Sequence, residues 1–561
     1  MPTVTLNRKE VETILGKKLS DDVLKDRISM LGTDLESLTK DSIEVEIFPN
    51  RPDMLSEQGF GRALASFIGT KPGLREYKIN TSSYTVTIDP TVKKVRPHTS
   101  CAVVKGLQLT DEKIRQIIQI QEKLHITYGR NRAKVAIGVY PCEKIAFPIT
   151  FFGAKPRDIQ FTPLGLQKEL TALQILSQHP AGRNYGHLLE GEKIFPFFKD
   201  AKNNILSMPP IINSEHVGRV DETTTEVFIE CSGFDYEVLH TCLIMIVTAL
   251  ADMGGKIYSV TLHEGKKKTV SPDIRPQTMK LDINYLQKRL GITLSKKEIE
   301  KLLKKMGYGI QKDDVLIPAY RADILHPIDL VEDIAIAYGY ENFKPIIPKV
   351  ATVGNELPLE RLKKTISELL IGLGCQEVYT YSIINAEFLK TTGFDTRSVT
   401  LANSLSEEYN VMRTSLIPSL LSTLKTNRNH EYPQQIFDMG IAFSDISDTK
   451  KLQKDSLSQT HVAEQERLCI ALCGEKIGFT NIKQIVNYIM KHFNTTYTLK
   501  EKTHTCFLEG RVGTIHTSQG NAGIMGEVNP FVLESFGLEY PVSIVEIDLQ
   551  ILYNLINEGT I

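Results

Sequence analysis

Apolar residues recur at two spacings along the chain, and these spacings predict helices that alternate with strands. Helical spacing of three or four residues occurs at Leu24, Ile28 and Leu31, and strict alternation occurs over residues 43–47. These are the patterns of an amphipathic helix and of a half-buried strand. Residues 1–85 are therefore predicted to form an N-terminal α/β unit.

Residues 50–69, NRPDMLSEQGFGRALASFIG, combine a turn with a helix. Pro52 favours the turn, and the apolar spacing from Leu55 predicts a helix that ends at Gly69. The simplest interpretation of the NRPD sequence is a rigid turn that caps this helix.

Residues 86–268 alternate between strand-like and helix-like stretches, which indicates one α/β domain. Residues 77–97 are polar and are predicted to connect it to the N-terminal unit. The expected strands lie within residues 96–109, 133–140, 204–214 and 226–235, and the expected helices span residues 111–124, 168–176 and 236–253.

The remaining chain divides into a small module and a larger domain. Residues 272–346 follow a proline-containing linker and show two helices, a strand and an acidic helix, an order similar to a winged helix. Residues 347–561 alternate strands and helices, and residues 444–464 are polar enough to predict an exposed loop. The fold class is therefore multidomain α+β. The markers of the last domain are residues 359–373, 378–383, 411–428, 434–443, 467–474, 505–516 and 522–538.

The module carries four acidic residues close together, and they allow two interpretations. Asp323 follows a strand-like run, whereas Asp329, Glu332 and Asp333 lie at the start of the last helix. Four carboxylates of this kind suit a hard cation such as magnesium. Asp329 is equally suited to cap the helix, with Glu332 three positions later as in a capping box. A capping carboxylate keeps a free lone pair, so the two roles are compatible.

Composition narrows the class of protein. A chain of 561 residues needs several cores, and 24% charged with 41% hydrophobic residues is typical of a globular protein. No apolar stretch is long enough to span a bilayer, and the first residues show no signal-peptide pattern, so we expect a cytoplasmic protein without a membrane partner. A net charge of −1 gives no general attraction to nucleic acid. The eight cysteines form no CxxC pair and are expected to be core residues.

Long motifs in the right order resemble the β subunit of phenylalanyl-tRNA synthetase of the archaeal and eukaryotic type. They include NRPDMLS near the start, and KLDINYLQKRLGITLSKKEIEKLLKKMGYGI with VLIPAYRADILHPIDLVEDIAIAYGY over residues 280–340. The resemblance implies magnesium at Asp323, Asp329, Glu332 and Asp333. It also implies an α subunit as partner, in an assembly of two α and two β chains. The tRNA for phenylalanine is the expected nucleic-acid partner, and the assembled enzyme is expected to use ATP.

The same resemblance implies that residues 86–268 form an editing domain, which hydrolyses tyrosine wrongly attached to that tRNA. An apolar pocket rejects an added hydroxyl group poorly, so a second site that grips the phenol is needed. The matching positions are Ser214, Glu230 and Ser232, with residues 131–134 as a basic rim for the tRNA end. From the pattern alone, the simpler interpretation is that Ser214 is a helix cap and Glu230 an exposed strand residue.

No Ser/His/Asp arrangement is recognisable, and His125, His187 and His216 are interpreted as surface residues.

For residues 347–561 the resemblance implies an antiparallel sheet domain like that of class II synthetases, without their working residues. A late arginine in a Gly-Leu-Glu-Arg pattern is missing, because Tyr540 follows Glu539. Adenylation and charging are therefore expected in the α subunit. The passage from Gly69 directly to the editing-like region, and the end of the chain after the catalytic-like domain, fit the archaeal and eukaryotic form.

Two rival functions remain open. A free-standing nucleic-acid-binding protein would use a basic helix of the module, and Lys296, Lys297, Lys301, Lys304 and Lys305 supply such a face. Glu298 and Glu300 interleave with them, as on a solvated surface. An independent deacylase that needs no partner is the other rival.

Overall fold

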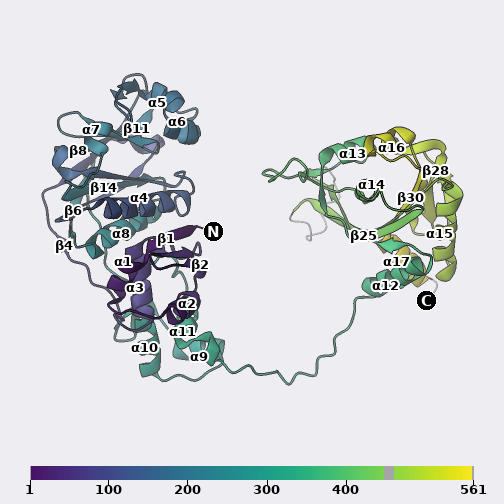
Figure 1. Ribbon diagram of the computed structural model, residues 1–561, viewed down its shortest axis with the longest axis horizontal. Coiled ribbons are helices and arrows are strands. Elements are labelled where there is room, and N and C mark those ends of the chain that lie inside the picture. The colour runs from purple at the N-terminus through teal and green to yellow at the C-terminus, as the bar shows by residue number, and fades with distance from the viewer. Residues whose placement is uncertain (1, 448–459, 559–561) are drawn as a thin grey trace. The chain divides into compact units, whose positions relative to one another are not determined.

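The computed structural model describes residues 2–447 and 460–558, and the chain divides into two compact units, Met1–Ile347 and Pro348–Ile561. Both units mix helices with strands, so the expected multidomain architecture of mixed secondary structure is confirmed (Figure 1). Within the described ranges, no helix is both long and apolar enough to cross a membrane.

The N-terminal domain is a three-stranded antiparallel sheet covered by three helices. The sheet order is β1-β3-β2, and the apolar sides of Leu24 and Ile28 are buried against it as the helical spacing predicts. Ser56 caps the third helix by accepting a hydrogen bond from the backbone of Gly59, and a 3-10 turn over Pro52–Met54 precedes it. The elements are β1 (Thr3–Asn7), α1 (Arg8–Leu15), α2 (Asp21–Met30), β2 (Asp34–Leu38), β3 (Ser42–Glu46) and α3 (Glu57–Phe67).

The middle domain contains a seven-stranded and a five-stranded sheet. Their orders are β13-β12-β11-β8-β5-β16-β17 and β4-β15-β6-β14-β7. The strands are β4 (Ile79–Asn80), β5 (Thr85–Ile88), β6 (His98–Lys105), β7 (Val135–Pro141), β8 (Ile149–Ala154), β11 (Phe195–Lys199), β12 (Ile205–Met208), β13 (Ile212–Asn213), β14 (Glu226–Gly233), β15 (Lys256–Tyr258), β16 (Val260–Glu264) and β17 (Lys267–Ser271), with a separate pair β9 (Gln160–Phe161) and β10 (Leu170–Thr171).

Alternation along the strands builds a three-layer packing. Val103 and Phe228 of the five-stranded sheet share a core with Phe151 and Phe198 of the seven-stranded sheet. The opposite face of the five-stranded sheet packs against helices α4 and α8 (Figure 1). Because successive side chains of a strand point to opposite faces, even-numbered residues of β14 point between the sheets. The helices are α4 (Asp111–Ile126), α5 (Ala172–Gln178), α6 (Pro180–Tyr185), α7 (Glu215–Gly218) and α8 (Tyr236–Asp252).

The helical module packs on the N-terminal domain within the first unit. Its three-stranded antiparallel sheet has the order β18-β20-β19. Its apolar residues continue the core of the N-terminal domain, so the two form one packed body. The elements are β18 (Gln277–Lys280), α9 (Ile283–Leu290), α10 (Lys296–Lys305), β19 (Gly309–Gln311), β20 (Asp314–Ile317) and α11 (Pro327–Tyr338).

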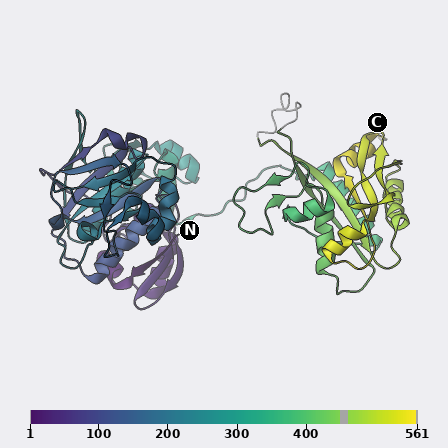
Figure 2. The ribbon, with the colours of Figure 1, turned by 90° about the horizontal axis from the view of Figure 1, so that it is seen from above.

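The second unit is a seven-stranded sheet with helices on both faces (Figure 2). The order is β21-β25-β26-β30-β29-β28-β27, antiparallel except for the pair β21 and β25. One face packs against α12, α15 and α17, and the other against α14 and α16. The elements are α12 (Pro358–Gly372), β21 (Gln376–Glu377), β22 (Ile383–Ile384), α13 (Ala386–Thr392), β23 (Val399–Thr400), β24 (Val411–Met412), α14 (Ile417–Thr426), β25 (Gln434–Asp445), β26 (Val462–Cys473), α15 (Phe479–His492), β27 (Thr498–Glu501), β28 (Phe507–Thr517), β29 (Gly520–Val528), α16 (Pro530–Phe536), β30 (Val542–Asp548) and α17 (Leu549–Glu558).

Three expectations about secondary structure need correction. The segment 77–97 is not only a connector, because β4 and β5 enter the two sheets of the middle domain. Residues 378–383 alternate in polarity but join a strand only at Ile383. The polar segment 444–464 is not a loop at its ends, since β25 and β26 extend into it, and residues 448–459 lie outside the described residues. All eight cysteines are buried, as expected.

Candidate functional site

The middle domain encloses a cavity of about 520 Å³ that is walled mostly by apolar residues. Helix α4, the edge strand β7, the turn at residues 209–213 and helix α7 form its walls. Glu230 is the one residue of β14 that reaches it. A concave apolar site with a few polar groups is the usual form of a small-ligand pocket.

Glu230 is buried, with 1% of its surface exposed, which excludes the interpretation as an exposed strand residue. The hydroxyl of Tyr140 lies 3.1 Å from its Oε1, whereas Oε2 is buried and finds no hydrogen-bond partner within the described residues. Burial raises the pKa of Glu230 to about 7, against the opposing effects of the Tyr140 hydrogen bond, the Arg96 charge and a Ser232 hydrogen bond. An unpartnered carboxylate oxygen at the cavity wall is a hydrogen-bond acceptor without a donor.

Tyr140 joins Glu230 to the opposite sheet. Its hydroxyl lies 2.8 Å from Oγ of Ser207 and 3.4 Å from Oδ1 of Asn213, and both residues line the cavity. Gly138 leaves room for the ring, because a Cβ there would lie 2.1 Å from the Tyr140 hydroxyl. The sequence did not indicate Tyr140 or Ser207, since the contacts of Tyr140 with Glu230 and with Ser207 bridge 90 and 67 positions of the chain.

Arg132 links two walls of the cavity through hydrogen bonds and an ion pair. Arg132 donates to the carbonyl oxygens of Pro210 (3.2 Å) and Ile211 (2.9 Å) and to Glu122 (2.9 Å). The predicted basic rim over residues 131–134 therefore uses its arginine to tie two walls of the cavity together. The backbone of Asn131 and Arg132 is left-handed, with φ angles of 50° and 67°.

His125 contacts Glu122, the partner of Arg132, and is not a surface residue, which corrects the expectation. Its Nε2 accepts a hydrogen bond from the backbone N–H of Ile137 at 2.8 Å, and its Nδ1 lies 3.0 Å from Glu122. A ring with Nε2 as acceptor carries its proton on Nδ1 and donates it to the carboxylate. Burial lowers the pKa of His125, so the neutral ring is favoured. His187 and His216 are exposed, as expected.

The two predicted serines lie near the cavity but do not line it within the described residues. Ser214 is buried and precedes α7, but its side chain makes no capping hydrogen bond. Ser232 is buried and accepts a hydrogen bond from Nε of Arg96 at 3.1 Å. Ser207 is the serine that the fold brings to the cavity beside Glu230.

The four acidic residues of the module line a second cavity of about 410 Å³, together with Arg51 and residues 29–32. Two of these carboxylates are engaged by Arg321, which lies 2.8 Å from Asp323 and 2.8 Å from Asp333. Asp329 accepts hydrogen bonds from the backbone N–H groups of residues 325 and 326, at 2.8 and 2.7 Å. The N-cap of α11 is His326, so Asp329 is the reciprocal partner of a capping box and not the cap itself.

The donor chemistry of this cluster fits a hard cation, and the cavity has room for a hydrated one. Within the described ranges, no three of the four residues bring ligand atoms within 4.8 Å of one another. Magnesium keeps several of its waters and needs only one or two direct carboxylates, so this wider spacing is compatible with it.

Comparisons with known proteins identify the family of this chain. The chain is 36% identical to the "Phenylalanine--tRNA ligase beta subunit" of Pyrococcus abyssi, covering 99% of this chain and 100% of that protein. It is 37% identical to the protein of the same name from Archaeoglobus fulgidus, covering 99% of both chains. The chain belongs to the family of phenylalanine–tRNA ligase β subunits.

Two family profiles and one solved structure support this membership in separate regions. The profile "Phenylalanyl tRNA synthetase beta chain CLM domain" matches residues 344–549, and "tRNA synthetase B5 domain" matches residues 279–340. A crystal structure of an N-terminal fragment of the β subunit from Pyrococcus horikoshii matches with a TM-score of 0.58 at 36% identity. It covers 60% of this chain and 99% of the fragment.

The second unit of this β-subunit family member buries several charges that are paired with one another. Arg413 donates to the carbonyl of Ile441 (2.9 Å) and to Oγ1 of Thr380 (2.6 Å), and it lies 3.4 Å from Asp438. Glu546 accepts from Oγ of Ser415 at 2.9 Å and pairs with Arg467. These contacts use the charges to hold the sheet and α14 together.

Proposed function

We propose that this chain acts with a phenylalanyl-tRNA synthetase α subunit, in a cytoplasmic assembly of two α and two β chains, to attach phenylalanine to its tRNA at the expense of ATP. We further propose that the cavity beside Glu230 hydrolyses tyrosine that has been attached to this tRNA in error. The unpartnered Oε2 of Glu230 at the cavity wall is the observation that carries the second proposal.

The cavity offers what a tyrosyl group needs and a phenylalanyl group does not. Its apolar walls accept an aromatic ring, and Oε2 of Glu230 can accept a hydrogen bond from the phenol. A buried polar group left without a partner costs about 1–3 kcal/mol, so one acceptor separates tyrosine from phenylalanine by ~10–100-fold. Alternatively, Glu230 orients the attacking water, and Ser207 then supplies a hydroxyl on the same wall.

In this proposal the middle domain is an editing domain, residues 272–346 form a winged-helix-like module, and the second unit is a class II-like domain that supports the α subunit. The paired state of Arg413, Asp438, Glu546 and Arg467 supports a structural role, because none of these side chains lines the hollow at residues 379–429 within the described part of the chain. Adenylation and charging are assigned to the α subunit.

Magnesium is proposed at the acidic cavity of the module, held by Asp323, Asp329, Glu332 and Asp333 in part through water. The ion would neutralise carboxylate charge that Arg321 balances only at Asp323 and Asp333. Its affinity should fall when Asp323→Asn removes a charge without changing the helix start. Equilibrium dialysis against magnesium measures this, with Asp22→Asn as the control, because Asp22 is exposed and does not line the acidic cavity. Unchanged binding in Asp323→Asn would leave the cluster with a capping role only.

The editing proposal is tested with the assembled enzyme and tyrosyl-tRNA for phenylalanine. Glu230→Ala should slow deacylation by ~10–100-fold and leave phenylalanine charging unchanged, because charging occurs in another chain. Glu226→Ala is the matched control: it lies on the same strand, pairs with Lys105 and does not line the cavity. Equal loss of charging and deacylation in Glu230→Ala would show a structural role instead.

The charging proposal predicts that the isolated chain attaches no phenylalanine to tRNA. Labelled phenylalanine, ATP and tRNA should give product only after the α subunit is added. Product from the lone chain would contradict the assignment of chemistry to the α subunit.

A further inference from the structure

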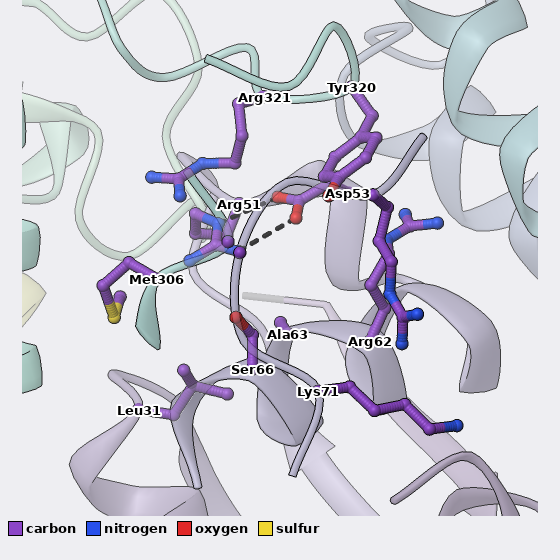
Figure 3. A pocket seen from close by; sticks show the side chains of 13 residues that line it. Leu31, Arg51, Asp53, Arg62, Ala63, Ser66, Lys71, Met306, Tyr320 and Arg321 are labelled. Atoms are coloured by element: carbon purple, nitrogen blue, oxygen red, sulfur yellow. Dashed lines mark hydrogen bonds and ion pairs between the residues drawn. The ribbon is translucent and has the colours of Figure 1, made fainter. Parts of the chain in front are cut away.

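Figure 3 shows a small cavity between the N-terminal domain and the helical module, which adjoins the acidic cavity and shares Leu31 and Arg51 with it. Five cationic side chains line it and only one carboxylate, that of Asp53, does so. Its volume is about 20 Å³, which is room for one or two water-sized groups. The cationic residues are Arg51, Arg62, Lys71, Arg75 and Arg321.

Two of these arginines are fixed by the same local motif. Arg51 donates through Nε and Nη2 to Asp53 at 2.9 and 2.9 Å, and Arg321 donates likewise to Asp323 at 2.8 and 2.8 Å. In each Arg-x-Asp sequence the carboxylate binds two nitrogens of the guanidinium group, which holds its plane in place. The third nitrogen, Nη1, is left for other partners.

Nη1 of Arg321 is buried and has no hydrogen-bond partner within the described residues, although only 1% of this side chain is exposed. A buried charged donor without an acceptor is costly. Burial and the charge of Arg321 also oppose ionisation of Arg51, while Asp53 keeps the pKa of Arg51 above its usual value. Two guanidinium groups therefore line one small space, and one nitrogen of Arg321 lacks an acceptor.

Nearby carboxylates balance the charge of the buried arginines but supply no acceptor to Nη1 of Arg321. Asp323 and Asp333 pair with Arg321 but do not line the cavity, and Asp252 pairs with Arg62 from outside it. Lys71 and Arg75 at the cavity make no ion pair within the described part of the chain. The missing group is therefore a hydrogen-bond acceptor, and an anion suits this position because Lys71 and Arg75 line the same cavity.

We propose that this cavity binds one small inorganic anion of the size of chloride, between Arg51 and Arg321. The volume admits an ion slightly larger than water and is too small for a tetrahedral oxyanion. Because Arg51 belongs to the N-terminal domain and Arg321 to the module, the ion joins the two across their interface. Stability of the first unit then depends on chloride concentration.

Anomalous diffraction locates such an ion directly. Crystals of the full-length chain grown with bromide in place of chloride should show one anomalous peak within contact distance of both guanidinium groups. Only water in the cavity, or bromide confined to exposed lysines as an adventitious ion only, would overturn the proposal.

Chloride-dependent unfolding tests the same site in solution. At constant ionic strength, replacing gluconate by about 100 mM chloride should raise the Tm of the first unit by ~2 °C, through binding to the folded state. Phosphate should not substitute, and equal stabilisation by phosphate or gluconate would contradict a site of this size.

Variants link the stabilisation to the cavity without disturbing the buried pairs. The double variant Lys71→Ala and Arg75→Ala should weaken chloride binding about 3–10-fold, because two uncompensated charges are lost near the ion. Lys78→Ala is the matched control, since Lys78 is exposed close by in sequence but does not line the cavity. An identical chloride response in the double variant and in wild type would refute the assignment to this cavity.

Discussion

Buried carboxylates serve different ends in the two units of the molecule. In the second unit Glu546 accepts from the Ser415 hydroxyl and the Leu416 backbone and pairs with Arg467. In the first unit the Tyr140 hydroxyl lies 3.1 Å from Oε1 of Glu230, and Oε2 has no hydrogen-bond partner within the described residues at the wall of a cavity. A charge that serves the fold is fully paired, because an unpaired one destabilises it. A carboxylate oxygen without a donor beside a cavity is available to a ligand. Glu230 is therefore placed to bind a ligand, whereas Glu546 stabilises the fold.

The largest expected effect is the loss of stability when Glu546, the structural carboxylate of this comparison, is removed. Glu546→Ala leaves the half-buried Arg467 and two buried donors without their acceptor and should destabilise the second unit by about 3 kcal/mol. Glu230→Ala should cost the first unit less than about 1 kcal/mol, because it removes a carboxylate that is only half satisfied. Urea unfolding of both variants measures this difference.

Glu534→Ala provides the control for the second unit, because that side chain is exposed. If Glu230→Ala proved as destabilising as Glu546→Ala, the two carboxylates would both be structural, and the comparison would fail.

The next effect concerns pH. The pKa of Glu230 is raised to about 7, so below this pH its carboxyl is increasingly protonated and loses acceptor strength. Deacylation should rise about tenfold per pH unit up to ~7 and then level off, after subtraction of spontaneous hydrolysis. The folded pKa lies above the unfolded value, so the stabilising contribution of this group is complete below the unfolded pKa and lost as pH rises towards 7.

Glu230→Gln has no proton to lose and should flatten both pH dependences. A profile in Glu230→Gln that still rises through pH 7 would assign the titration to another group.

Local patterns predicted the secondary structure correctly where an element forms from its own residues and needs no distant partner. The apolar run of α8 is read from neighbouring residues alone, and this helix occurs where expected. Residues 378–383 have the alternation of a strand, but most of them find no pairing strand, and pairing is a property of the whole sheet. Alternation alone therefore overpredicted this strand.

The candidate site was predicted in part, for the same reason. Glu230 was recognised from its motif, but its burial depends on the packing of one sheet on another. His125 is buried because Glu122 and the backbone of Ile137 satisfy both ring nitrogens, and neither contact is visible as a pattern. Ser207 and Ser214 are close in sequence, but Ser207 lies within β12 and lines the cavity, whereas Ser214 lies after β13 and does not.

A smaller effect tests how Glu230 is held. Tyr140→Phe removes the hydroxyl next to Oε1 and should slow deacylation by ~5–10-fold, in line with one hydrogen bond. That hydrogen bond lowers the pKa of Glu230, so its loss should also move the pH profile to higher pH. Tyr497→Phe removes a hydroxyl in the second unit and should change neither quantity. A slower reaction with an unmoved pH profile would make Tyr140 a packing residue.

The smallest expected effect separates the two serines near the cavity. Ser207→Ala removes a hydroxyl that lies 2.8 Å from the Tyr140 oxygen on the cavity wall, and deacylation should fall by ~2–5-fold. Ser214→Ala should leave deacylation unchanged, because its side chain neither caps α7 nor lines the cavity within the described residues. Rates measured on tyrosyl-tRNA under single-turnover conditions resolve a difference of this size. The reverse result, with Ser214→Ala slow and Ser207→Ala unaffected, would mean that the ester of tyrosyl-tRNA lies beside α7. Oε2 of Glu230 would then not position the ester.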